Sequence, residues 1–205
     1  MKFKEYYIKF KELVEENRKS IYIYSLIFTL IFSIFNRVLG VIKESLWHES
    51  ISIYYFFLVV IKGILLLYFY KSKTKKNESI VFNIIKILLI ILNILLIVPI
   101  VLLVLNKRSV EMTLIPSIAI ALYVTIKTSV VIAQYVKRKK EDSILIRELR
   151  TINLMDVTVS ILTLTNTLIA VNSTYFDIGL FNLVVAISIM GFGLNMFIVI
   201  RLKKH

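Results

Sequence analysis

The chain has 205 residues, of which 58% are hydrophobic and 19% are charged, and its mean hydropathy is +0.81. Soluble domains have about 45–50% apolar and about 25% charged residues, so this composition excludes an ordinary soluble domain and a disordered chain. The formal net charge is +13, but most basic residues flank long apolar runs. Anionic lipid headgroups are therefore the expected partner, and nucleic acid is not.

The first 19 residues (1–19) are predicted to form an amphipathic arm on the cytoplasmic side. Lysines and glutamates separate apolar residues that recur at helical spacing: Phe3, Tyr6, Tyr7, Phe10, Leu13 and Val14. Such a helix can lie on the anionic inner leaflet, where it would anchor the chain. The alternative is a solvated, charged arm.

Residues 20–205 are predicted to form an all-α, six-helix transmembrane bundle. A membrane span needs about 20 mostly apolar residues, and the runs are too long for the strands of a transmembrane barrel. Basic residues concentrate in the arm, in the second and fourth connections and at the carboxyl end, which places both termini in the cytoplasm. The six predicted spans are Ser20–Asn36, Ile51–Tyr70, Ile80–Leu105, Met112–Val136, Asn153–Val171 and Ile178–Ile200.

The connection between the first two spans holds a possible pair of metal ligands. Glu44 and His48 are four residues apart, so a helix would place them on one face. A plain interfacial turn with Trp47 as its anchor is the favoured interpretation, because no third ligand lies nearby. We therefore predict no metal site.

Polar residues inside the spans fall into one-sided stripes. The first span carries Ser25, Thr29 and Ser33, and the fifth carries Asp156, Ser160 and then Thr163 and Thr167. Helix packing through interhelical hydrogen bonds is the favoured explanation. The alternative is the lining of a polar pathway.

Three lysines within the spans are the sharpest feature of the sequence. Lys62, Lys86 and Lys127 all fall in the predicted inner half of the bilayer, and Asp156 enters from the same side. They could form a basic vestibule, in which Lys62, Lys127 and Asp156 are the strongest candidates for binding an anion. The alternative is snorkelling, in which each ammonium group reaches the headgroups along its own helix.

Two functions follow from these alternatives. A vestibule favours a membrane protein that handles a small anionic solute or lipid headgroup through the bundle. Lipid-facing lysines on a solid bundle favour a scaffold, which would act as the partner subunit of a membrane complex or as a homo-oligomer. Neither role needs a cofactor. The chain has no cysteine and no nucleotide-binding or hydrolase motif, so we do not expect an enzyme.

Two stretches carry a resemblance to a known family. One is Asn36–Ile42 followed by Ser45–Tyr55 and Lys62, and the other is Ile152–Leu154 with Val159–Leu164. Together they resemble a family of uncharacterised small six-span bacterial integral membrane proteins. The resemblance implies an all-helical fold, a place in the bacterial cell (inner) membrane and a cation at position 62. It implies no substrate.

Overall fold

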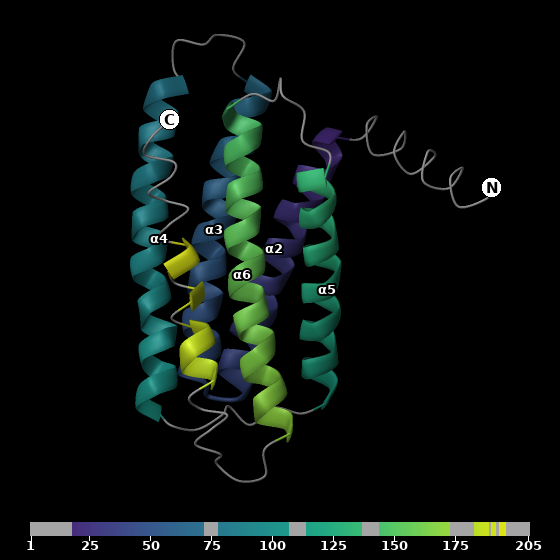
Figure 1. Ribbon diagram of the computed structural model, residues 1–205, viewed down its shortest axis with the longest axis vertical. Coiled ribbons are helices and arrows are strands. Elements are labelled where there is room, and N and C mark those ends of the chain that lie inside the picture. The colour runs from purple at the N-terminus through teal and green to yellow at the C-terminus, as the bar shows by residue number, and fades with distance from the viewer. Residues whose placement is uncertain are drawn as a thin grey trace, which may run out of the picture.

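The computed structural model describes residues 18–71, 78–106, 114–136, 144–172, 183–188, 190–191 and 193–195. In these ranges the chain is helical apart from one tight turn. Five long helices stand side by side and alternate in direction (Figure 1). They are α2 (Arg18–Ile42), α3 (Leu46–Lys71), α4 (Glu78–Asn106), α5 (Leu114–Val136) and α6 (Ile144–Asn172).

The five helices are long and apolar enough to cross a membrane, and their apolar stretches are 20 to 24 residues long. This confirms the all-helical, membrane-suited architecture. A shorter apolar helix, Leu183–Asn195, lies where the sixth span was predicted. The sixth span and the cytoplasmic position of both termini therefore stay predictions. The predicted arm, residues 1–19, lies outside the described residues except for Arg18 and Lys19, which begin α2.

The turn between α2 and α3 is much shorter than the sequence suggested. Only residues 43–45 leave the helices, and the Ser45 amide donates to the Gly40 carbonyl at 2.9 Å. Gly40 is needed here, because a Cβ atom would stand 2.7 Å from Cγ of Glu49. The extra helical turns allow a hydrogen bond of 3.0 Å between Asn36 Oδ1 and His48 Nδ1.

This turn corrects the interpretation of the predicted loop. Glu44 lies outside both helices with a positive φ of 48°, so it does not share a helical face with His48. His48 and Trp47 are buried inside the bundle, at 1% and 4% exposure. Trp47 is therefore not an exposed interfacial anchor. In the part of the chain described, no three potential metal-ligating side chains gather.

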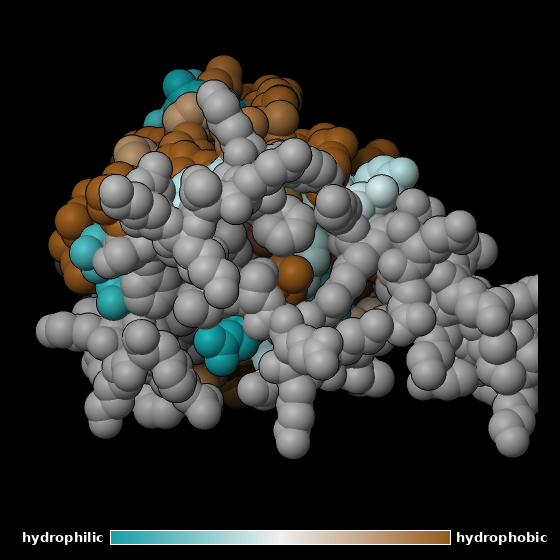
Figure 2. Space-filling view, turned by 90° about the horizontal axis from the view of Figure 1, so that it is seen from above, coloured by the Kyte–Doolittle hydropathy of each residue, from teal (hydrophilic) through white to brown (hydrophobic). Residues whose placement is uncertain are grey.

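Helices α3 and α6 form the inner part of the bundle. The α3 side chains of Ile51, Tyr55, Leu58 and Leu65 are fully buried. In Figure 1, α6 stands between α4 and α5, and α2 and α3 lie behind it. The outer surface is apolar instead of charged: Ile87 and Ile94 on α4 are each 59% exposed. Brown apolar side chains also line the visible edge of the bundle in Figure 2. Such a surface is stable against lipid and unstable in water.

Candidate functional site

Four helices bring polar side chains together inside the bundle. Thr29 comes from α2, Lys62 from α3, Lys127 from α5 and Asp156 from α6. Apolar residues adjacent to them in sequence, such as Ile61 and Met155, are fully buried, so hydrophobic packing helps to position the four groups. We call Lys62, Lys127 and Asp156 the charge cluster.

The two lysines of the charge cluster share one carboxylate oxygen. Lys62 Nζ and Lys127 Nζ both form ion pairs with Oδ2 of Asp156. The side chains of Lys62, Lys127 and Asp156 are 2%, 4% and 0% exposed. Neither ammonium group snorkels to the surface. The geometry therefore favours the internal arrangement over snorkelling for these two lysines.

Thr29 lies at the centre of the charge cluster. Its Oγ1 accepts hydrogen bonds from Lys62 at 3.0 Å and from Lys127 at 2.8 Å. The same oxygen lies 2.9 Å from Asp156 Oδ2 and 2.8 Å from the Ser25 carbonyl, and its single proton can be donated to either. Thr29 therefore ties α2 to three other helices through one atom.

Aromatic side chains close the cluster on the α5 side. Lys127 Nζ donates to the hydroxyl group of Tyr123, one turn earlier on α5. The ammonium group also lies 5.7 Å from the centre of the Tyr55 ring, within the range of cation–π attraction. Phe32 packs edge-on against Tyr55 and stacks on Tyr123.

Both ammonium groups of the charge cluster have a full set of hydrogen-bond partners, but the charges of the cluster do not balance. An ammonium group has three protons. Lys127 uses them on Asp156, Thr29 and Tyr123, and Lys62 uses them on Asp156, Thr29 and Ser25. Asp156 is the only acid that pairs with either lysine in the described ranges. With both lysines protonated and Asp156 ionised, one positive charge is in excess.

The carboxylate is used unevenly. All of its contacts fall on Oδ2, and the buried Oδ1 atom has no hydrogen-bond partner within the described residues. A buried carboxylate oxygen without a donor is energetically costly. The carboxylate is therefore held in place by two ammonium groups that both bind its Oδ2 atom.

A chain of hydrogen bonds leads from the charge cluster toward the end of the bundle where α6 begins. Lys62 Nζ donates to Ser25 Oγ at 3.4 Å, and Ser25 donates to Asn153 Oδ1 at 3.0 Å. Asn153 Nδ2 donates to Gln134 Oε1, also at 3.0 Å. The polar stripe of the first span is therefore part of an interhelical network.

In the opposite direction the network is shorter. Ser160 Oγ donates to the Asp156 carbonyl at 2.7 Å, and Tyr55 OH lies 2.8 Å from Ser160 Oγ. Beyond this point, Thr163 and Thr167 each donate to a carbonyl of their own helix. The α6 stripe thus serves the site near Asp156 and satisfies the helix backbone farther away.

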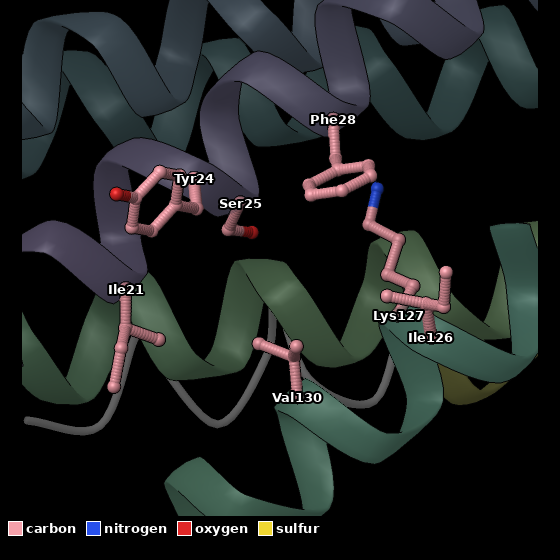
Figure 3. A pocket seen from close by; sticks show the side chains of 7 residues that line it. All are labelled: Ile21, Tyr24, Ser25, Phe28, Ile126, Lys127 and Val130. Carbon is pink, nitrogen blue, oxygen red and sulfur yellow. The ribbon is translucent and has the colours of Figure 1, made fainter. Parts of the chain in front are cut away.

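An apolar crevice lies between α2 and α5 and reaches Lys127. Its volume is about 100 Å³. Figure 3 shows its lining, to which both helices contribute. The lining residues are Ile21, Tyr24, Ser25, Phe28, Ile126, Lys127 and Val130.

The structure brings three of the four predicted site residues together and separates the fourth. Lys86 lies on α4, is partly exposed, and interacts electrostatically with Glu148 on α6. Sequence reasoning missed the contributions of Gln134, Asn153 and Tyr123. The spacing of four between Tyr123 and Lys127 was the available signal, since it places both on one helical face.

No protein family, characterised protein or solved structure matches the chain. The residues and their geometry are therefore the basis for assigning a function. The described part of the chain is an apolar helical bundle suited to a membrane, with a buried charge cluster inside it.

Proposed function

We propose that this chain is an integral membrane protein that handles a small anionic group, carried by a solute or by a lipid headgroup, at the charge cluster. The observation that carries the proposal is the pairing of two buried ammonium groups with one carboxylate. Ionisable residues in membrane spans are costly and mark binding sites or ion pathways by default. An anion bound beside Lys62 and Lys127 would neutralise the excess positive charge.

Burial of the lysines favours this function over the scaffold alternative. A scaffold needs only outward-facing surfaces, and lysines in its spans would be expected to point to lipid or to snorkel. Here Lys62 and Lys127 point inward and meet an acid from a third helix. The crevice supports the same choice, because the Lys127 side chain forms part of its wall.

An incoming anion would have to replace an existing partner of a lysine. Lys127 donates to the two neutral hydroxyl groups of Thr29 and Tyr123 in addition to Asp156. An anionic oxygen attracts an ammonium group more strongly than a neutral hydroxyl oxygen does, because two full opposite charges then meet. Exchange of one hydroxyl for an anionic oxygen is therefore the expected binding step.

The test is ligand-dependent stabilisation of the whole chain in phosphatidylcholine nanodiscs. Three probes are used: inorganic phosphate, phosphatidylglycerol mixed into the nanodisc, and dodecanoate. A ligand that binds only the folded state raises the unfolding temperature. We expect at least one probe to do so for the wild-type chain and for Lys86→Met, and we expect the shift to be lost in Lys127→Met.

Lys127→Met is informative because it leaves the balanced pair of Lys62 and Asp156. The variant is expected to fold, and its unfolding temperature without probe verifies this. Lys86→Met removes a lysine that lies in another span, outside the charge cluster. A shift of equal size in Lys127→Met and wild type, or no shift with any probe, would overturn the proposed function.

A further inference from the structure

The crevice between α2 and α5 has three properties that together indicate what enters it. It is lined mostly by hydrocarbon, it adjoins Lys127 at one wall, and several of its side chains are also on the outer surface. Tyr24 is 60% exposed, and Phe28 and Ile126 are each 39% exposed. In a membrane-embedded bundle, this surface faces lipid, so the crevice opens to the lipid phase.

The packing of the two helices explains the opening. Helix α2 packs extensively against α3, and α5 packs extensively against α6, whereas α2 and α5 contact each other only sparsely. The polar bridge between them is the hydrogen bond from Lys127 to Thr29. The crevice lies beside this bridge, with Ser25 and Phe28 on the α2 wall and Val130 on the α5 wall (Figure 3).

A ligand for this space needs both an apolar part and a negative charge. Inorganic anions would gain nothing from walls of isoleucine, valine and phenylalanine. A neutral alkyl chain would gain nothing from Lys127 and the excess positive charge of the charge cluster. Charge complementarity and apolar lining together favour an amphiphilic anion.

The size and depth of the crevice favour one alkyl chain over two. Lys127 lies eight residues before Tyr135, the end of the apolar stretch of α5, which is about 12 Å along the helix. A diacyl phospholipid would have to draw its phosphate and glycerol this far into the hydrocarbon layer. A volume of about 100 Å³ holds roughly three water molecules, so it accommodates a small headgroup with the first carbons of one chain.

We propose that the α2–α5 crevice admits a single-chain carboxylate amphiphile from the lipid, with its carboxylate at Lys127 and its alkyl chain extending past Tyr24 and Ile126 into the membrane. This inference rests on the proposed function and specifies its ligand class and its route of entry. The carboxylate takes the place of a hydroxyl partner of Lys127, and no covalent bond changes. Entry is lateral, so the ligand never crosses the aqueous phase.

The test is photocrosslinking in phosphatidylcholine nanodiscs with a single-chain fatty acid that carries a diazirine close to its carboxylate. Crosslinked residues are identified by mass spectrometry. We expect the label on crevice residues of both helices near Lys127, chiefly Ser25, Phe28 and Ile126. Unlabelled dodecanoate should compete at least tenfold better than dodecanol, which lacks the charge, and acetate, which lacks the chain.

A pair of matched tryptophan variants tests the role of the crevice, because one fills it and the other does not. Val130→Trp places an indole in the crevice and should lower crosslinking at least tenfold, whereas Ile132→Trp adds the same group to the exposed surface of α5 and should leave it unchanged. Ile132 is 58% exposed and does not line the crevice. Unfolding temperatures of both variants verify that they fold.

The outcomes separate this inference from the proposed function. The lateral route is overturned if the label is distributed evenly over lipid-facing residues. It is also overturned if Val130→Trp and wild type are labelled equally. In that case a Lys127-dependent shift with phosphate or phosphatidylglycerol still supports anion handling. A second copy of the chain seated in the crevice would exclude the probe and make Val130→Trp change the oligomeric state, which also overturns the inference. If Lys127→Met alters neither labelling nor any stability shift, both proposals fail.

Discussion

Lys62 and Lys127 meet at a single atom, Oδ2 of Asp156, although they come from different helices that each pack mainly against other neighbours. This arrangement makes Asp156 the link between α3, α5 and α6. It also makes the site asymmetric in charge, because one carboxylate serves two ammonium groups. We therefore expect Asp156 to stabilise the bundle as the counter-charge of both lysines, and we expect the charge that it leaves unbalanced to favour anion binding.

Asp156→Asn is expected to destabilise the protein strongly. The substitution keeps the size of the side chain but leaves two ammonium groups buried without a counter-charge. Loss of one partner of a buried ion pair costs about 3–5 kcal/mol. The measurement is the free energy of unfolding in detergent micelles or nanodiscs.

The control for this prediction is Lys86→Met. It removes a partly exposed charge from a predicted span without touching the charge cluster, so its effect on the free energy of unfolding should be smaller than that of Asp156→Asn. An Asp156→Asn variant as stable as Lys86→Met would show that the lysines do not depend on the carboxylate.

Replacing the whole charge cluster should separate stability from function. In the triple variant Lys62→Met, Lys127→Met and Asp156→Leu, no charge remains in the cluster, and Thr29 can still donate to the Ser25 carbonyl. Buried ion pairs replaced by well-packed apolar groups often give neutral or increased stability. We expect an unfolding free energy at least equal to that of wild type, together with complete loss of probe-dependent shifts. Marked destabilisation would instead indicate that the cluster holds the bundle together.

The charged residues of the site could be found from the sequence, because a lysine or an aspartate within an apolar run is conspicuous. The shallower position of Lys86 in its span made it a weaker candidate than Lys62, but the sequence could not show which lysine points inward. Both lie within predicted spans, but Lys62 is on the buried helix α3 and Lys86 is on α4, which has a large lipid-facing surface. Which cation points inward depends on how helices distant in sequence pack, and hydropathy contains no information on that.

The predicted length of the α2–α3 connection was wrong for a related reason. The sequence predicts that the first span ends at Asn36 and that the second begins at Ile51, whereas α2 continues to Ile42 and α3 begins at Leu46. Pairing across the two helices accommodates these polar groups: Asn36 bonds to His48, and Ser33 and Ser52 each donate to the other's carbonyl. Burial of a polar group is acceptable once it is hydrogen-bonded, and the partner here is on another helix.

Gly40→Ala should destabilise the α2–α3 hairpin. The new methyl group would lie 2.7 Å from Cγ of Glu49 and 3.0 Å from its backbone nitrogen, so α3 would have to move. Overpacking of this kind costs about 1–3 kcal/mol. The free energy of unfolding is the measurement.

Gly63→Ala is the matched control for the hairpin prediction. Gly63 lies inside α3, and a Cβ atom there would meet nothing within 4 Å. Alanine is the better helix former by roughly 0.5–1 kcal/mol, so this variant should be as stable as wild type or more stable. Equal losses in both variants would mean that close helix contact at Gly40 has no special role.

The native chain contains no cysteine, which allows a direct test of the predicted topology. Lys43 is exposed in the turn between α2 and α3, and six spans with cytoplasmic termini place this turn outside the cell. In intact bacterial cells, a membrane-impermeant maleimide should label Lys43→Cys and should label His205→Cys only after the cells are opened. With five spans and an inside N-terminus, His205→Cys would instead be labelled in intact cells. Protection of Lys43→Cys together with labelling of His205→Cys would reverse the orientation. Because the two labels report the sides on which Lys43 and His205 lie, this pair of variants decides whether the number of spans is even or odd and on which side the lysine-rich ends lie.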